Sequence, residues 1–60
     1  MAKTFEDING NIIEIEKYET SLELNEDIIT GKVSGYFVIV KDYKYEVSRP
    51  VYEAVENYIG

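Results

Sequence analysis

Cysteine, histidine and tryptophan are absent from this chain of 60 residues, and proline occurs once, at Pro50. Without cysteine there can be no disulfide and no thiolate metal site, and without histidine there are no imidazole ligands. A serine nucleophile usually needs a positioned base, and the usual base is missing for Ser21, Ser34 and Ser48. We therefore expect no metal, no cofactor and no enzymatic activity.

Long apolar segments are also missing. No run of residues approaches the length of a membrane span, and the N-terminal residues lack the apolar region of a signal peptide. Together with the lack of cysteine, these features predict a cytoplasmic location.

Positive charge is scarce, with six basic residues against twelve acidic ones and a net charge of −6. Residues 1–30 contain eight acidic and two basic residues, whereas residues 31–60 contain four of each, so all of the excess lies in the first half. Nucleic acids and anionic membranes are bound mainly through Lys and Arg. The charge therefore predicts no direct contact with either.

Apolar residues make up 45% of the chain and include six Tyr and two Phe among the aromatics, which favours a folded core over disorder. The length predicts a single domain over residues 1–60. A domain of this size is only marginally stable, and it has no disulfide or metal to stabilise it. We therefore predict a homodimer.

The first half has the alternating pattern of an antiparallel sheet. Asn9-Gly10 predicts a hairpin turn between residues 4–6 and 11–16, because both residues tolerate a positive φ. Ile13 and Ile15 then share one face of the second strand. A turn or bulge at residues 18–20 precedes a strand with Leu22 and Leu24, and residues 25–27 are expected to form a loop.

Residues 28–40 are rich in strand-forming residues, and Gly31 and Gly35 predict a bulge or two shorter strands there. Residues 36–40 are apolar on both faces, which is typical of a central strand. Residues 41–44 are expected to form a tight turn, followed by a strand over residues 45–47.

A helix is expected to follow. Ser48 is the expected N-cap, Pro50 suits the first turn, and Glu53 lies near the positive end. Apolar residues at helical spacing from Val51 to Ile59 predict that it packs on the sheet, since about ten to twelve residues would not be helical alone. The fold class is therefore α+β: a small antiparallel sheet of three to five strands with one C-terminal helix.

Two features are candidates for contact with a partner, namely the acidic first half and the tyrosines that flank the expected turn at residues 41–44. The predicted partner-binding residues are Glu14, Glu16, Glu19, Glu23, Glu26, Asp27, Tyr43 and Tyr45. The residues expected to form the core or a dimer contact are Tyr36, Val38, Val40, Tyr52, Val55 and Ile59.

The segment from Val40 to Glu53, with a Tyr45-Glu46-Val47 strand and a Val51-Tyr52 helix start, resembles the tail of small phage-encoded accessory proteins. The opening at residues 5–11, Phe-Glu-Asp through Gly-Asn, is similar to theirs. Tyr43 stands where such turns often have Gly, so this turn departs from their pattern. The resemblance covers about a third of the chain and implies no catalytic residues. It implies an accessory protein of the kind that includes acidic, dimeric inhibitors of bacterial defence systems.

The leading hypothesis is a non-enzymatic inhibitory protein, phage-derived, that docks on a host protein through acidic and Tyr-rich surfaces. One alternative is a DNA mimic, in which a continuous ridge of carboxylates imitates the phosphate backbone and blocks a nucleic-acid-binding enzyme. The other is a structural or assembly subunit of a larger particle.

Overall fold

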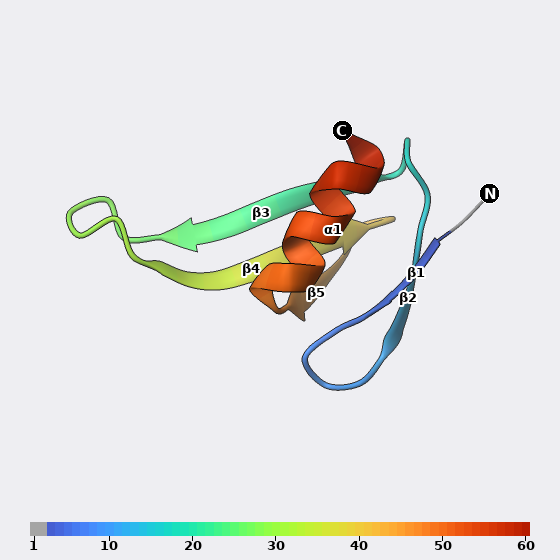
Figure 1. The fold of residues 1–60 in the computed structure, drawn as a ribbon, viewed down its shortest axis with the longest axis horizontal. Coiled ribbons are helices and arrows are strands. Elements are labelled where there is room, and N and C mark those ends of the chain that lie inside the picture. The colour runs from blue at the N-terminus through green and yellow to red at the C-terminus, as the bar shows by residue number, and fades with distance from the viewer. Residues whose placement is uncertain (1–2) are drawn as a thin grey trace.

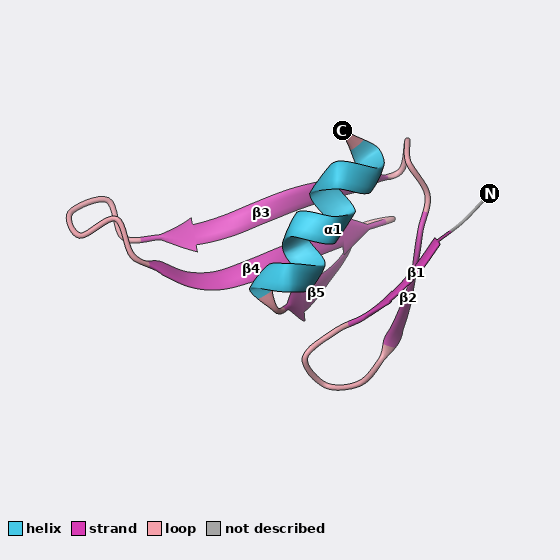
Figure 2. Ribbon diagram, viewed as in Figure 1, coloured by secondary structure: helices cyan, strands magenta, loops and turns pink. Residues whose placement is uncertain are grey.

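A computed structural model describes residues 3–60 of the chain as five antiparallel strands in two sheets and one C-terminal helix, which confirms the α+β fold class (Figures 1 and 2). The elements are β1 (Lys3–Glu6), β2 (Ile12–Ile15), β3 (Thr20–Glu26), β4 (Val33–Val40), β5 (Tyr43–Val47) and α1 (Arg49–Ile59). Strands β1 and β2 form a separate hairpin, and β3, β4 and β5 form a three-stranded sheet in that order.

The β1–β2 hairpin is closed by a loop that Asp7 organises. The Asp7 carboxylate accepts hydrogen bonds from the amides of Asn9 and Asn11 at 2.9 and 2.8 Å, and from the Asn11 side chain at 3.0 Å. The Asn11 side-chain hydrogen bond, joined by the backbone amides, lowers the pKa of Asp7, against the opposing effect of desolvation. Gly10 has φ +85°, but Asn9 does not have a positive φ, because the longer loop needs only one left-handed residue.

The predicted turn before β3 is confirmed. The Glu16 carbonyl accepts hydrogen bonds from the Glu19 amide at 3.1 Å and from the Thr20 hydroxyl at 2.7 Å. Leu22 is an even-numbered residue and Ile13 and Ile15 are odd-numbered, so an unbroken strand would place them on opposite faces. The turn changes the register, and Leu22 packs against the same core as Ile13 and Ile15.

Strand β4 is central, as predicted, with β3 and β5 on either side. Gly35 lies within one continuous strand, and a register shift pairs Asn25 with Gly35 but Glu26 with Val33. The bulge reading of this segment is therefore correct, and the alternative of two shorter strands is wrong. The ring of Phe37 folds over Gly35, where an added Cβ would lie 2.9 Å from it.

Two loop boundaries differ from the prediction. Asn25 and Glu26 belong to β3, and the loop runs over residues 27–32, so only Asp27 of the predicted loop lies in it; Asp27 and a left-handed Gly31 (φ +73°) close a turn there. The expected strand character of Ile28 and Ile29 is therefore wrong. Local hydrogen bonding by an aspartate side chain has outweighed strand propensity.

The β4–β5 turn is shorter than predicted. It contains only Lys41 and Asp42, with φ +49° and +70°, and Tyr43 and Lys44 already belong to β5. A two-residue hairpin with both residues at positive φ matches the right-handed twist of the strands, so the turn forms even without glycine.

Helix α1 has the predicted cap. Ser48 is extended and its hydroxyl accepts a hydrogen bond from the Val51 amide at 3.5 Å, while Pro50 occupies the first turn. Glu53 pairs with Arg49 at 3.2 Å, one turn away, and the Gly60 amide donates to the Glu56 carbonyl. Local interactions therefore stabilise both ends of the helix.

The core joins the hairpin, the sheet and the helix on one side of the sheet (Figure 1). Its buried apolar residues are Ile13, Ile15, Val38, Val40, Val47 and Val55. Of the residues predicted for the core or a dimer contact, Val38, Val40 and Val55 are buried. Tyr36, Tyr52 and Ile59 pack against them, with the Tyr36 and Tyr52 ring centroids 5.3 Å apart.

The hairpin also contacts the sheet through the backbone. The amide of Ile8, in the β1–β2 loop, donates to the Glu46 carbonyl on β5 at 3.0 Å. This bond and the burial of Ile13 and Ile15 set the hairpin across the end of the sheet, and a cleft remains between them.

Candidate functional site

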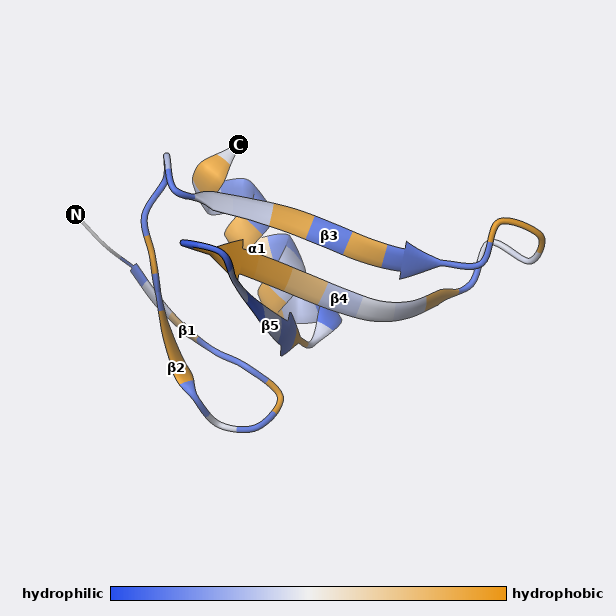
Figure 3. Ribbon diagram, turned by 180° about the vertical axis from the view of Figure 1, so that it is seen from behind, coloured by the Kyte–Doolittle hydropathy of each residue, from blue (hydrophilic) through white to orange (hydrophobic). Residues whose placement is uncertain are grey.

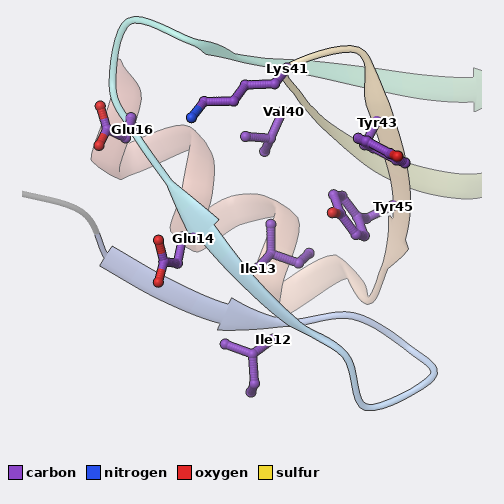
Figure 4. Close-up of a pocket in the computed structure, with 8 residues that line it drawn as sticks. All are labelled: Ile12, Ile13, Glu14, Glu16, Val40, Lys41, Tyr43 and Tyr45. Carbon is purple, nitrogen blue, oxygen red and sulfur yellow. The ribbon is translucent and has the colours of Figure 1, made fainter.

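A cleft of about 490 Å³ separates β2 from the adjoining ends of β4 and β5 (Figure 4). Its lining residues are Ile12, Ile13, Glu14, Glu16, Val40, Lys41, Tyr43 and Tyr45. Four of the eight predicted partner-binding residues therefore meet here: two carboxylates from the hairpin side and two tyrosines from β5.

The apolar part of the cleft follows from strand alternation. Tyr43 and Tyr45 are two residues apart on β5, so they share the face that also presents Val40 on β4. Their ring centroids are 6.4 Å apart, and Tyr43 is 71% exposed whereas Tyr45 is half-buried. The cleft thus has a partly exposed aromatic wall.

The charged part of the cleft lies opposite. Figure 4 shows the Glu14 and Glu16 carboxylates along β2 and the residue after it, on the side away from the tyrosine rings, with Lys41 extending toward Glu16. Lys41 pairs with Glu19 at 3.6 Å, so Glu19 lies next to the cleft without lining it. The cleft therefore has tyrosine rings on one wall and carboxylates at its opposite border, and a cationic side chain is attracted by both kinds of group.

The remaining predicted contact residues lie elsewhere. Glu23 lies on the opposite face of the sheet, where it pairs with Lys44. Glu26 and Asp27 lie at the far end of the β3–β4 hairpin (Figure 1). The six predicted contact carboxylates therefore occupy three separate places and do not form one continuous ridge.

Two exposed residues were not predicted as contacts. Ile28 and Ile29, in the β3–β4 loop, are 96% and 94% exposed. Their exposure could have been anticipated from Asp27 followed four residues later by Gly31, a local turn signal stronger than two β-branched residues.

Within residues 3–60, no group of three or more carboxylates is placed to bind a metal ion. Among the same residues, no helix has both the length and the apolar character needed to cross a bilayer. Comparison with protein families, curated proteins and solved structures finds no match to this chain.

Proposed function

We propose that this chain is a non-enzymatic binding protein that docks on a protein partner through the cleft between β2 and β5. The observation that supports this most is the meeting of Glu14 and Glu16 with Tyr43 and Tyr45 around one recess. These residues come from distant parts of the sequence, and the fold places them around one cleft.

The cleft suits a partner that presents Lys or Arg. A guanidinium can stack on a tyrosine ring, and its charge is attracted by the carboxylates at the border of the cleft, which makes Arg the better match of the two. The net charge of −6 would also attract a basic surface over several ångströms and speed association at low salt.

The resemblance to small phage-encoded accessory proteins suggests the biological setting. We propose that the partner is a host protein of a bacterial defence system and that the chain inhibits it in the host cytoplasm. The dispersal of Glu14, Glu23 and Glu26 over separate places favours protein docking over the DNA-mimic alternative, which requires one ridge. Copy number in purified particles would separate an inhibitor from an assembly subunit.

Self-association is proposed as well. Phe37 and Ile39 are half-buried on the face of the sheet away from the core, and no helix covers that face within residues 3–60. Sedimentation velocity at micromolar concentration should show a dimer. A monomer at these concentrations would contradict the proposal.

The test is an affinity pull-down from bacterial lysate at low and high salt, followed by measurement of Kd for the purified partner. Glu14→Gln/Glu16→Gln should weaken binding and flatten its salt dependence, because charged contacts near the surface are screened. Tyr43→Ser should weaken binding about tenfold or more at every salt concentration, as expected for a desolvated aromatic contact.

Matched controls lie outside the cleft. Tyr18 is 97% exposed in the turn before β3, and Glu56 is exposed on the helix. Tyr18→Ser and Glu56→Gln should leave Kd within about twofold of wild type, as expected for residues outside the contact. A partner whose Kd responds to these controls and not to the cleft variants would exclude the cleft as the contact.

A further inference from the structure

The end of the β3–β4 hairpin projects from the body of the protein and presents the two most exposed aliphatic side chains of residues 3–60, Ile28 and Ile29. This β3–β4 tip (residues 27–32) lies at one end of the 39 Å long axis (Figure 1). Figure 3 shows an apolar segment there, separated from the core by the hydrophilic end of β3 and by a pale, near-neutral part of β4. Ile28 and Ile29 gain no burial within the chain, so packing inside the fold does not account for them.

The tip is ordered by its own hydrogen bonds. The Asp27 carboxylate accepts from the amides of Ile29 at 2.8 Å and Thr30 at 3.2 Å, and the Asp27 carbonyl accepts from the Gly31 amide at 2.8 Å. The Asp27 amide donates to the Lys32 carbonyl at 2.8 Å. The backbone that carries the isoleucines is therefore held in one conformation before any contact is made, which lowers the entropy cost of binding.

Polar groups surround the base of the tip. A shallow groove there is lined by Asn25, Glu26, Asp27, Thr30, Lys32 and Ser34. An apolar centre within a polar border is the usual composition of a protein–protein contact, where the centre is desolvated and the border stays wet. Two carboxylates against one ammonium group leave this border negative.

We propose that the β3–β4 tip is a second docking element, which inserts Ile28 and Ile29 into an apolar recess with a basic rim on a protein partner. The negative border argues against an anionic membrane. It also argues against the cleft of a second copy, because Glu14 and Glu16 line that cleft. This contact is independent of the proposed function of the cleft and lies at the other end of the molecule.

The test replaces Ile28 with the photo-crosslinking residue p-benzoylphenylalanine in the full chain expressed in bacteria. The partner in the crosslinked adduct is identified and then purified in its free form. Its Kd is measured for the wild type, for Ile28→Ser/Ile29→Ser and for the control Ile8→Ser. Ile8 is a partly exposed isoleucine in the other hairpin loop. The hydrogen bond from its backbone amide to the Glu46 carbonyl does not involve the side chain. Circular dichroism should show all variants folded.

The expected result is an adduct with one partner, a loss of affinity of roughly thirtyfold or more for the Ile28/Ile29 variant, and no more than about a twofold change for Ile8→Ser. The loss should persist in the Glu14→Gln/Glu16→Gln background, which separates the tip from the cleft. An adduct only with a second copy, isoleucine-dependent binding to phosphatidylcholine vesicles, the absence of any adduct, or wild-type affinity of the Ile28/Ile29 variant would each overturn the proposal.

Discussion

The ammonium group of Lys44 on β5 lies 4.5 Å from the centroid of the Phe37 ring on β4 and also pairs with Glu23 on β3. One side chain thus joins all three strands across the face of the sheet that faces away from the core. The Phe37 ring in turn covers Gly35, so the cation, the ring and the glycine form one stacked cluster.

Lys44→Gln should destabilise the protein by about 1 kcal/mol. Cation–π contacts at exposed sites contribute about 0.5–1 kcal/mol, and a partly exposed ion pair adds less. Urea unfolding measures the change. Lys41→Gln, which breaks the more exposed pair with Glu19, is the matched control and should cost under about 0.5 kcal/mol. Equal losses in the two variants would mean that the ring contact contributes nothing.

Lys41→Asn should raise stability. Lys41 has φ +49°, a conformation that Lys adopts at a cost and that Asn tolerates well. A gain of about 0.5–1 kcal/mol would raise Tm by several degrees in a domain of this size. Thermal unfolding by circular dichroism measures it, with Lys41→Gln as the reference that loses the same pair with Glu19. A Tm of Lys41→Asn no higher than that of Lys41→Gln would contradict the prediction.

The pH dependence of stability should report on Asp7. Because the folded state lowers the pKa of this carboxyl, its ionisation stabilises the fold above the ordinary value of 3.8. That contribution is lost as the pH falls through the lowered folded pKa. The stability difference between wild type and Asp7→Asn should therefore be full near pH 7 and shrink below pH 3.8. Urea midpoints measured across pH 2–7 test this, and a difference that stays constant at low pH would contradict it.

Local signals allowed most of the fold to be predicted from the sequence. Ser48 and Pro50 specify the helix start by themselves, and the apolar run at residues 36–40 needs a central position whatever its neighbours are. The β-branched residues Ile28 and Ile29 predict a strand at the tip, but the hydrogen bonds of Asp27 and the positive φ of Gly31 decide its conformation.

The cleft could be predicted only in part. Glu14, Glu16, Tyr43 and Tyr45 were chosen for their chemistry, but nothing local shows that they meet. Their meeting depends on how the β1–β2 hairpin docks against the sheet, which is a non-local contact that alternation patterns do not specify.

The docking of that hairpin is the last testable point, and it depends on Ile15. Ile15 is fully buried, whereas Ile12 on the other face of β2 is 66% exposed. Ile15→Ala should cost about 2–5 kcal/mol, which is most of the stability of so small a domain, while Ile12→Ala should change it by less than about 0.5 kcal/mol.

A milder variant separates loosening of the hairpin from global unfolding. Ile15→Val should cost about 0.5–1.5 kcal/mol and leave the protein folded. The Ile8 amide donates a hydrogen bond to the Glu46 carbonyl across the two sheets. The substitution should accelerate hydrogen exchange at this amide more than at the amides that join β3 to β4. Equal acceleration at both places would mean that hairpin and sheet open only together. Faster exchange at Ile8 alone would show that the cleft can widen while the sheet and helix stay folded, since the hairpin forms one of its two walls.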